Sequence, residues 1–294
     1  MDMFTLMSGL QLTCIYGILA IGVSIIWSSL GMLNLAHGFT FAASGYGAWW
    51  AATTFSKSAW VVFGAGISTG ALIGIVIYFV AFLYIHDRPN YPIRALIATM
   101  AINLIGVQTL MWVFGPRMKP IPKVFGSGVI KLGEVVMTYG QMGTVVCSVG
   151  VLGALLIWLG LSRRGLEIRA VMQNPEGAAL VGISLRTTAL WVMILTGALA
   201  GLAAILLSQT FYVSPYAGLQ PLIKGLIVAL LGGLGSIGGA MLGAVIIGFA
   251  EAMTAAYLGG QYVLMVQFGM IIVILLLRPR GIAGLLDEAR ESSD

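Results

Sequence analysis

Residue types that perform chemistry are scarce and scattered in this 294-residue sequence. Its imidazole groups belong to His37 and His86, and its thiols to Cys14 and Cys147, which both lie in apolar runs. Two separated thiols do not predict a disulfide framework, and two distant imidazoles do not predict a metal centre. No acid, base and nucleophile come together along the chain either. We therefore expect a chain that is not an enzyme and that binds no cofactor itself.

Polar side chains inside apolar runs are the better candidates for function. Asn34 and His37, followed by Gly38, interrupt an apolar run at 31–38. Residues three apart on a helix share a face, so these two side chains can act together. Polar groups in membrane segments line or shape a solute path, or they form the hydrogen bonds between helices that fix packing. Both interpretations stay open at this point.

Lys224 and Glu251 are the lone charges between Arg186 and Arg278. Ionisable residues within membrane segments are functional candidates. Lys224 lies near the start of its apolar run, where a lysine can extend its ammonium group to the membrane surface. Glu251 sits deeper and is the stronger candidate for the solute path. The sequence leaves open whether the two residues pair.

Glycine dominates residues 232–239, which therefore do not form a regular, stable helix. A Walker loop needs a Gly-Lys-Ser/Thr sequence that does not follow here, and no strand precedes the segment as a dinucleotide fold requires. Broken helices at membrane depth line a cavity or are covered by protein. We take Gly232, Gly233 and Gly235 as candidates for the solute path. The breaks at 31–38 and 232–239 lie in opposite halves of the chain, which suggests related halves around a central path.

The segment 162–186 is the longest polar stretch between apolar runs on its side of the membrane. It predicts a short helix of about two turns that lies across the membrane surface. The face formed by Ala178, Ala179 and Leu180 is small and apolar and suits a groove in a partner protein. An ordinary loop with a surface helix is the alternative. The signals for the helix ends are Asn174 as N-cap, Pro175 at the first position, Glu176 in the first turn and Gly182 at the C-terminus.

The elements that position these residues follow from composition. Charged residues make up 9% of the chain and hydrophobic ones 59%, whereas soluble domains carry about 25% charged residues. Long charge-free runs can each hold a membrane helix of about 20 residues, and small residues such as the 40 glycines let such helices pack closely. The sequence therefore predicts an all-α, polytopic transmembrane bundle of eight or nine spans, forming a single domain over 1–294. We expect the spans at 5–27, 30–52, 60–84, 93–114, 139–161, 187–208 and 262–277. The stretch 222–258 is too long for one span and holds either two crossings joined at 232–239 or a helix and a re-entrant piece.

Basic residues in the short loops predict the orientation. The segments 85–94, 162–186 and 278–294 are separated by pairs of spans, so they share a side, and they carry most of the arginines. The positive-inside rule places this side, with the tail 278–294, in the cytoplasm. The cations are spread over several loops rather than one basic face, a pattern that does not indicate nucleic-acid binding.

These segments together resemble a known family. The chain is similar to the permease subunits of branched-chain amino acid ABC importers, the LivH-like group, over nearly its whole length. The matching segments are Asn34-Leu35-Ala36-His37-Gly38 with the later Gly45-Tyr46-Gly47-Ala48, the glycine-rich 231–243 with Gly248 and Glu251, and Leu277-Arg278-Pro279-Arg280-Gly281. A fourth similarity, to the loop that docks on the ATPase in this family, rests on Arg169-Ala170, Asn174, Ala178-Ala179 and Gly182-Ile183.

The resemblance implies a place in a larger assembly in the bacterial plasma (inner) membrane. The expected partners are a second, LivM-like permease, two ATPase subunits of the LivG/LivF type that hold ATP and magnesium, and an extracytoplasmic solute-binding protein. The expected activity is import of branched-chain or other hydrophobic amino acids by alternating access. Phe39-Thr40 follows His37-Gly38 where many relatives carry an acidic residue, so urea, short amides and aromatic acids remain alternative solutes. A self-contained secondary transporter is the alternative from another class.

Overall fold

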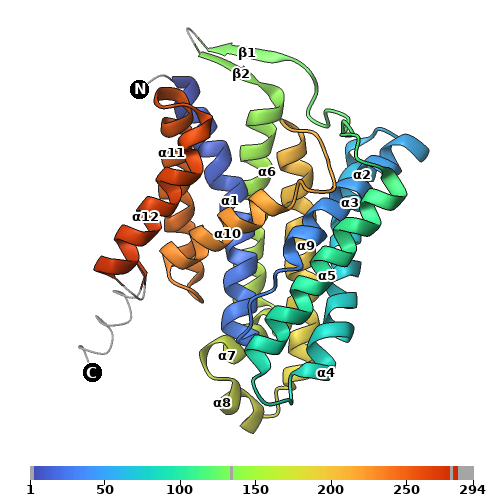
Figure 1. Ribbon diagram of the computed structural model, residues 1–294, viewed down its shortest axis with the longest axis vertical. Helices are drawn as coiled ribbons and strands as arrows, with labels where there is room; N and C mark the ends of the chain where they lie inside the picture. The colour runs from blue at the N-terminus through green and yellow to red at the C-terminus, as the bar shows by residue number, and fades with distance from the viewer. Residues whose placement is uncertain (1–2, 133–134, 279–280, 284–294) are drawn as a thin grey trace.

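The computed structural model describes residues 3–132, 135–278 and 281–283, and it is a helical bundle (Figure 1). Among the described residues, seven helices are long and apolar enough to cross a membrane. The predicted all-α bundle is therefore confirmed, whereas the predicted count of eight or nine spans is not. The seven are α1 (Met3–Leu30), α3 (Ala59–Ile77) continued through the π-helical Tyr78–Phe82 and α4 (Leu83–Ile85), α5 (Tyr91–Phe114), α6 (Tyr139–Leu161), α9 (Leu185–Ser208), α11 (Ile237–Tyr257), and α12 (Val263–Leu277) with the preceding 3-10 turn Gly260–Tyr262.

Shorter elements fill the remaining chain. The helix α2 (His37–Thr54) follows α1, the helices α7 (Arg163–Gln173) and α8 (Pro175–Leu180) connect α6 to α9, and α10 (Leu219–Gly232) precedes α11. The strands β1 (Val129–Leu132) and β2 (Val135–Thr138) form an antiparallel hairpin with Ile130 opposite Met137. The hairpin lies at the end of the bundle opposite α7 and α8 (Figure 1). The sequence analysis predicted α8 but neither α7 nor the hairpin.

The prediction of a continuous span at 30–52 is wrong. Residues 31–36 are not helical, because Gly31 adopts a left-handed φ of 62° that ends α1. The side-chain oxygen of Asn34 then accepts a hydrogen bond from the Ala36 backbone N–H at 3.0 Å, which holds a turn. The next helix begins only at His37. Asn34 and His37 consequently do not share a helix face, as the spacing argument expected.

The long stretch 222–258 divides into a short helix and a full span. The turn at 233–236 separates α10 from α11, and Gly233 and Gly235 have φ values of 99° and 95° that favour glycine. The 14 residues of α10 span about 21 Å at about 1.5 Å per residue, which is less than the hydrocarbon core of about 30 Å. Two crossings within this stretch are therefore not found: α11 is long enough to cross, and α10 is a shorter apolar helix beside it.

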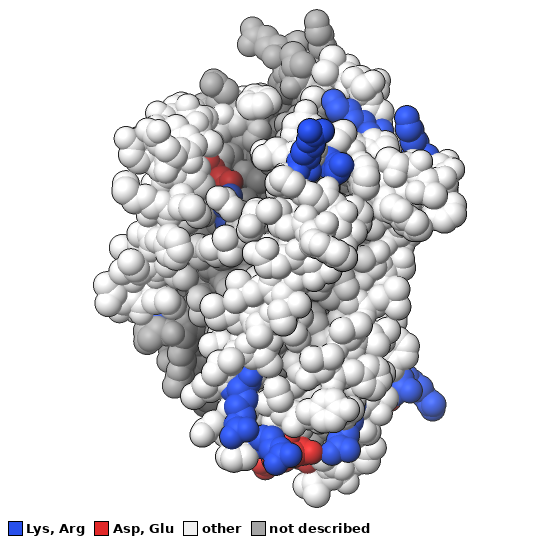
Figure 2. All heavy atoms as spheres, turned by 45° about the vertical axis from the view of Figure 1, so that its right-hand side comes forward, with Lys and Arg blue, Asp and Glu red and all other residues white. Residues whose placement is uncertain are grey.

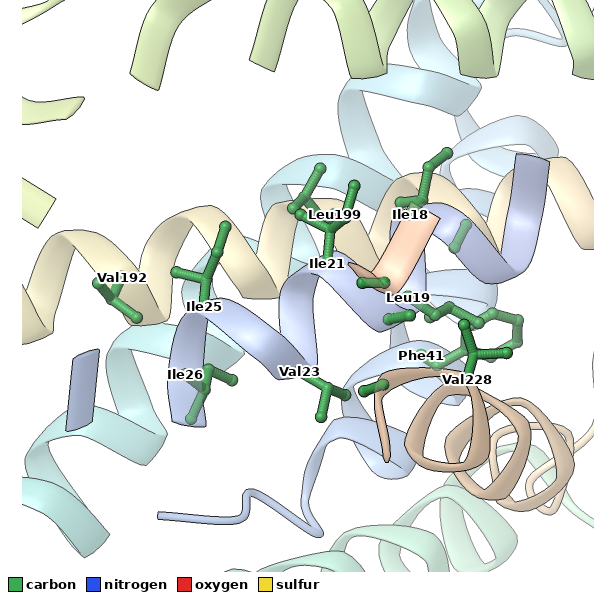
Figure 3. Packing of buried hydrophobic residues seen from close by; sticks show 14 of the residues in the cluster. Ile18, Leu19, Ile21, Val23, Ile25, Ile26, Phe41, Val192, Leu199 and Val228 are labelled. Carbon is green, nitrogen blue, oxygen red and sulfur yellow. The ribbon is translucent and has the colours of Figure 1, made fainter. Parts of the chain in front are cut away.

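The centre of the bundle is α1. The most apolar 18-residue window of α1 is 83% buried, compared with 17% for the corresponding windows of α5 and α12. Figure 3 shows Ile18, Ile21 and Ile25 of α1 beside Leu199 and Val192 of α9, with Val228 of α10 on another side. The outer helices expose large apolar side chains, such as Trp112 and Leu276. Such a surface suits lipid rather than water.

Close helix packing at glycines, as the composition predicted, is found between α3 and α9. An added Cβ at Gly70 would collide with the carbonyl oxygen of Gly197, and one at Gly197 with the carbonyl oxygen of Gly70. Gly201 meets the carbonyl of Gly66 in the same way. The two backbones thus touch directly, which is how membrane helices associate when lipid supplies no hydrophobic drive.

Charge gathers at the two ends of the molecule. Figure 2 shows Lys and Arg at both ends, with acidic residues beside them at one end and in a separate charged patch in a hollow, and a largely uncharged surface between the ends. At the end that carries α7 and α8, Arg186 pairs with Asp87 at 2.9 Å. This contact confirms that the segments 85–94 and 162–186 lie at the same end of the bundle. At the opposite end, Lys119 and Val213 exchange backbone hydrogen bonds.

Candidate functional site

A buried ion pair forms the most distinctive polar site of the bundle. Lys224 Nζ lies 2.6 Å from Glu251 Oε1, and the two side chains are only 11% and 12% exposed. Tyr16 donates a hydrogen bond to Glu251 Oε2 at 2.8 Å, and Gln267 Nε2 donates to the same oxygen at 2.8 Å. Lys224 also donates to the Tyr16 hydroxyl at 3.0 Å. Lys224 is therefore paired inside the protein and does not extend to the membrane surface.

Four helices bring these side chains together. Tyr16 comes from the middle of α1, Lys224 from α10, Glu251 from α11 and Gln267 from α12. The glycine turn makes the arrangement possible, because it reverses the chain and sets α11 beside α10. Gly225 of α10 packs on Leu19 of α1, one turn from Tyr16. The site thus depends on the same close packing that holds the core.

The ion pair lies in the wall of a cavity. The cavity measures about 230 Å³, and Lys224, Glu251 and Tyr16 line it together with apolar side chains. The rest of the wall comes from α1, α2, the end of α9, the segment after it and the start of α10: Leu12, Phe41, Leu207, Ser208, Phe211, Tyr212, Ser214, Ala217, Gln220 and Pro221. Of the seven candidates for the solute path predicted from the sequence, Glu251 is the one in this wall.

The candidates at 31–38 lie elsewhere, at the junction of α2 with α10. His37 is buried against α1, where Gly22 leaves room for its ring, and no described residue hydrogen-bonds its Nε2 atom. Gly38 touches the backbone of Gly218, since an added Cβ at Gly218 would overlap the Gly38 carbonyl. The start of α2 is held by α5, whose Asn103 side chain accepts from the Phe39 N–H at 2.9 Å. A role for Asn34, His37 and Gly38 in the solute path stays a prediction.

The candidate glycines form a closed turn. Gly232 packs backbone to backbone on Gly239. The segment 281–283 covers the end of α10, where Ala283 N–H donates to the Gly232 carbonyl at 3.0 Å. Gly235 lies against Ser28 at the end of α1. A broken helix at membrane depth is tolerated where it lines a cavity or is covered by protein, and protein covers the turn at the contacts just described. That Gly232, Gly233 and Gly235 line the solute path stays a prediction.

The predicted short helix in 162–186 is present as α8. The Asn174 side chain accepts from the Gly177 N–H at 2.8 Å, as an N-cap does, and Gly182 has a φ of 88° just beyond the helix. Ala178 is buried against the chain itself, whereas Leu180 is 89% exposed. Pro175, Glu176 and Ala179 on α8, and Arg169 on α7, are also exposed.

The chain is similar to known proteins over most of its length. Residues 5–275 match the family described as branched-chain amino acid transport system / permease component. The chain belongs to this permease family. It is 31% identical to the branched-chain amino acid transport permease BraD of Pseudomonas aeruginosa, over 95% of this chain and 94% of that one. It is 30% identical to the permease LivH of Salmonella typhimurium over 94% of each chain, and 29% identical to a probable LivH of Methanocaldococcus jannaschii over 91% and 88%.

Two members of the site in this permease were missed from the sequence. Gln267 carried a usable signal in the sequence, because it is a lone amide in the apolar run 262–277. Tyr16 carried none, because a tyrosine in an apolar helix is equally typical of core packing. Both become visible only once the helices are placed around Glu251.

Proposed function

We propose that this permease forms half of the membrane channel of an ATP-driven importer for branched-chain or other hydrophobic amino acids. The match over residues 5–275 carries the proposal, because it includes the whole bundle, the cavity and α8. The relatives are named as permeases of branched-chain amino acid transport. Urea, short amides and aromatic acids are the alternative solutes within the same class of transporter.

The proposed assembly contains a second, LivM-like permease, two LivG/LivF-like ATPase subunits and an extracytoplasmic binding protein. ATP and magnesium belong to the ATPase subunits and not to this chain. In the bacterial plasma membrane, the arginine-rich end with α7 and α8 faces the cytoplasm, in keeping with the positive-inside rule. The tail 278–294 is assigned to the same side from its sequence, and most of it lies outside the described residues. The hairpin end then faces the binding protein.

The contact with the ATPase is proposed to involve α8 and its neighbours, namely Arg169, Asn174, Pro175, Glu176, Ala178, Ala179 and Gly182. Leu180 and Val181 are 89% and 77% exposed at this charged end. Exposed apolar side chains next to charged ones are typical of protein contacts. ATP binding by the partner subunits would move α8. The helices of the bundle would then close the cavity to one side of the membrane and open it to the other, which is a change between two states that a ligand drives.

The test replaces Leu180 by Asp and measures solute uptake and ATP hydrolysis by the assembled transporter. Leu180 tests the surface more directly than Ala178, because Ala178 also packs against this chain. A charge buried at a contact without a partner costs about 3 kcal/mol or more, so uptake should fall about tenfold or more. The control is the same substitution at Leu258, which directly follows the C-terminal end of α11 and is 62% exposed. Unchanged uptake and hydrolysis with Leu180→Asp would contradict the role of α8.

A further inference from the structure

The cavity wall holds charge that helix packing does not require. A buried ion pair gains less from attraction than its groups lose on leaving water, so apolar residues of similar size hold helices together at least as well. In a membrane bundle ionisable groups are costlier still and mark solute or ion pathways. Lys224 and Glu251 are both largely buried and both border the cavity. Their position calls for a role beyond holding α10 against α11.

Lys224 and Glu251 have hydrogen-bond donors and acceptor positions that no described residue occupies. An ammonium group has three N–H donors, and within the described part of the chain Lys224 donates to Glu251 and Tyr16, which leaves one donor. A carboxylate has about four acceptor positions, and Glu251 accepts from Lys224, Tyr16 and Gln267, which leaves one acceptor position. Gln267 Oε1 is buried beside them with no partner among the described residues. Lys224 and Glu251, which both line the cavity, thus have one unused donor and one unused acceptor position, whereas Gln267 is buried behind them and does not line it.

A second cavity borders the same segment of the chain and lies nearer one end of the bundle. It measures about 610 Å³ and lies under the hairpin, with Lys123, Ser127 and Thr138 among its lining residues. The two cavities share Ser208, Phe211 and Tyr212, which belong to the end of α9 and the segment after it. Phe211 and Tyr212 are 59% and 63% exposed. The shared segment is therefore the boundary between an outer chamber and the pocket with the ion pair.

We propose that Lys224 and Glu251, with Tyr16 and Gln267, form a recognition site for a small zwitterion that enters past Phe211 and Tyr212. This inference rests on the proposed function, because it assumes that the bundle carries a solute. The solute's carboxylate takes the free donor of Lys224, and its ammonium group takes the free acceptor position of Glu251, while Gln267 holds the Glu251 carboxylate from outside the pocket. Charge-assisted hydrogen bonds are about twice as strong as neutral ones, so the pair favours a zwitterion over a neutral amide.

The size and lining of the pocket restrict the solute further. Its volume of about 230 Å³ is below the roughly 300–1,000 Å³ of pockets for drug-sized ligands. Leu12, Phe41 and Leu207 give the pocket an apolar side next to the charged one. A compact molecule with one zwitterionic end and a short hydrocarbon end matches this wall.

The test measures occupancy of the pocket directly, in the assembled transporter without ATP. Cys14 and Cys147 are replaced by alanine, and Ser214→Cys places a thiol in the pocket wall. Ser127→Cys in the same background places the control thiol in the outer chamber. Labelling rates with N-ethylmaleimide are measured against L-leucine, 4-methylpentanoate, which lacks the ammonium group, and 3-methylbutylamine, which lacks the carboxylate.

L-Leucine is expected to slow labelling at Ser214→Cys but not at Ser127→Cys. Each single-charge analogue should need a concentration at least about tenfold higher for the same protection, because it forms charge-assisted hydrogen bonds with only one member of the pair. Lys224→Met and Glu251→Gln should remove the protection by L-leucine, whereas Asp87→Asn, the same kind of change at an exposed pair, should not. Equal protection by the three compounds, protection that survives both pocket variants, or no protection at Ser214→Cys would overturn the inference.

The single-charge analogues act on the unaltered pair, so the comparison holds even where a pocket variant fails to fold. Because labelling is followed without ATP, it measures solute binding separately from ATP-driven uptake. Protection together with uptake that needs no ATPase would support the recognition site and contradict the importer. ATP-driven uptake without selective protection would support the importer and contradict the site.

Discussion

Removing only the cation of the buried pair should destabilise the protein more than removing both charges. Lys224→Met leaves the Glu251 carboxylate, whose side chain is 12% exposed, with hydrogen bonds from Tyr16 and Gln267 but no counter-charge. Breaking a buried pair in this way costs about 3–5 kcal/mol. At about 2 °C per kcal/mol for a chain of this size, the melting temperature should fall by about 6–10 °C.

The double variant Lys224→Met/Glu251→Gln removes the unpaired charge while keeping the size of both side chains. It should recover at least half of the lost melting temperature, because a neutral amide is far cheaper to bury than a carboxylate. Thermal unfolding of the detergent-purified protein measures both effects. Asp87→Asn is the matched control, since its pair with Arg186 is 67% and 64% exposed and such pairs contribute about 1 kcal/mol or less. A single variant that melts with the control would refute the reasoning.

Two further predictions concern packing and capping. Gly197→Leu should lower the melting temperature by several degrees, because the Gly70 carbonyl occupies the space and overpacking costs about 1–3 kcal/mol. Gly150→Leu is the control, since no described atom lies within 4 Å of a Cβ added there, and it should leave the melting temperature unchanged. Equal melting temperatures of the two variants would count against the close contact of α3 with α9. Asn174→Ala should weaken α8 by about 1 kcal/mol and speed amide hydrogen exchange within 175–180 alone, so unchanged exchange there would show that the cap contributes nothing.

The long helices and α8 follow from the sequence because their signals are local. A charge-free run of about 20 residues predicts a membrane helix by itself, whatever its neighbours are. The span Tyr139–Leu161 was predicted in this way and is found as α6. The segment Asn174-Pro175-Glu176 likewise carries its own start signal, and the structure places the helix at Pro175–Leu180. Such features need no tertiary information.

The site could be predicted only in part, because it depends on how helices are rotated and paired. Glu251 was a candidate as a deep lone charge, but its partner is 27 positions away on a helix that only the turn at 233–236 brings alongside. Tyr16 reaches Lys224 across 208 positions. The start of α2 at His37 was also hidden, since Thr99 and Asn103 of α5 supply the hydrogen bonds that allow the preceding segment to leave the helix. Contacts of that kind leave no periodic pattern in a single sequence.

The central claim is that this chain carries solute through the membrane when partner subunits hydrolyse ATP. The most direct measurement is uptake of radiolabelled L-leucine into proteoliposomes that hold the complete transporter, with and without ATP and with and without this chain. Uptake that requires ATP, the binding protein and this chain is the predicted result. Uptake that persists without the ATPase subunits, or that is unchanged when this chain is left out, would contradict the account.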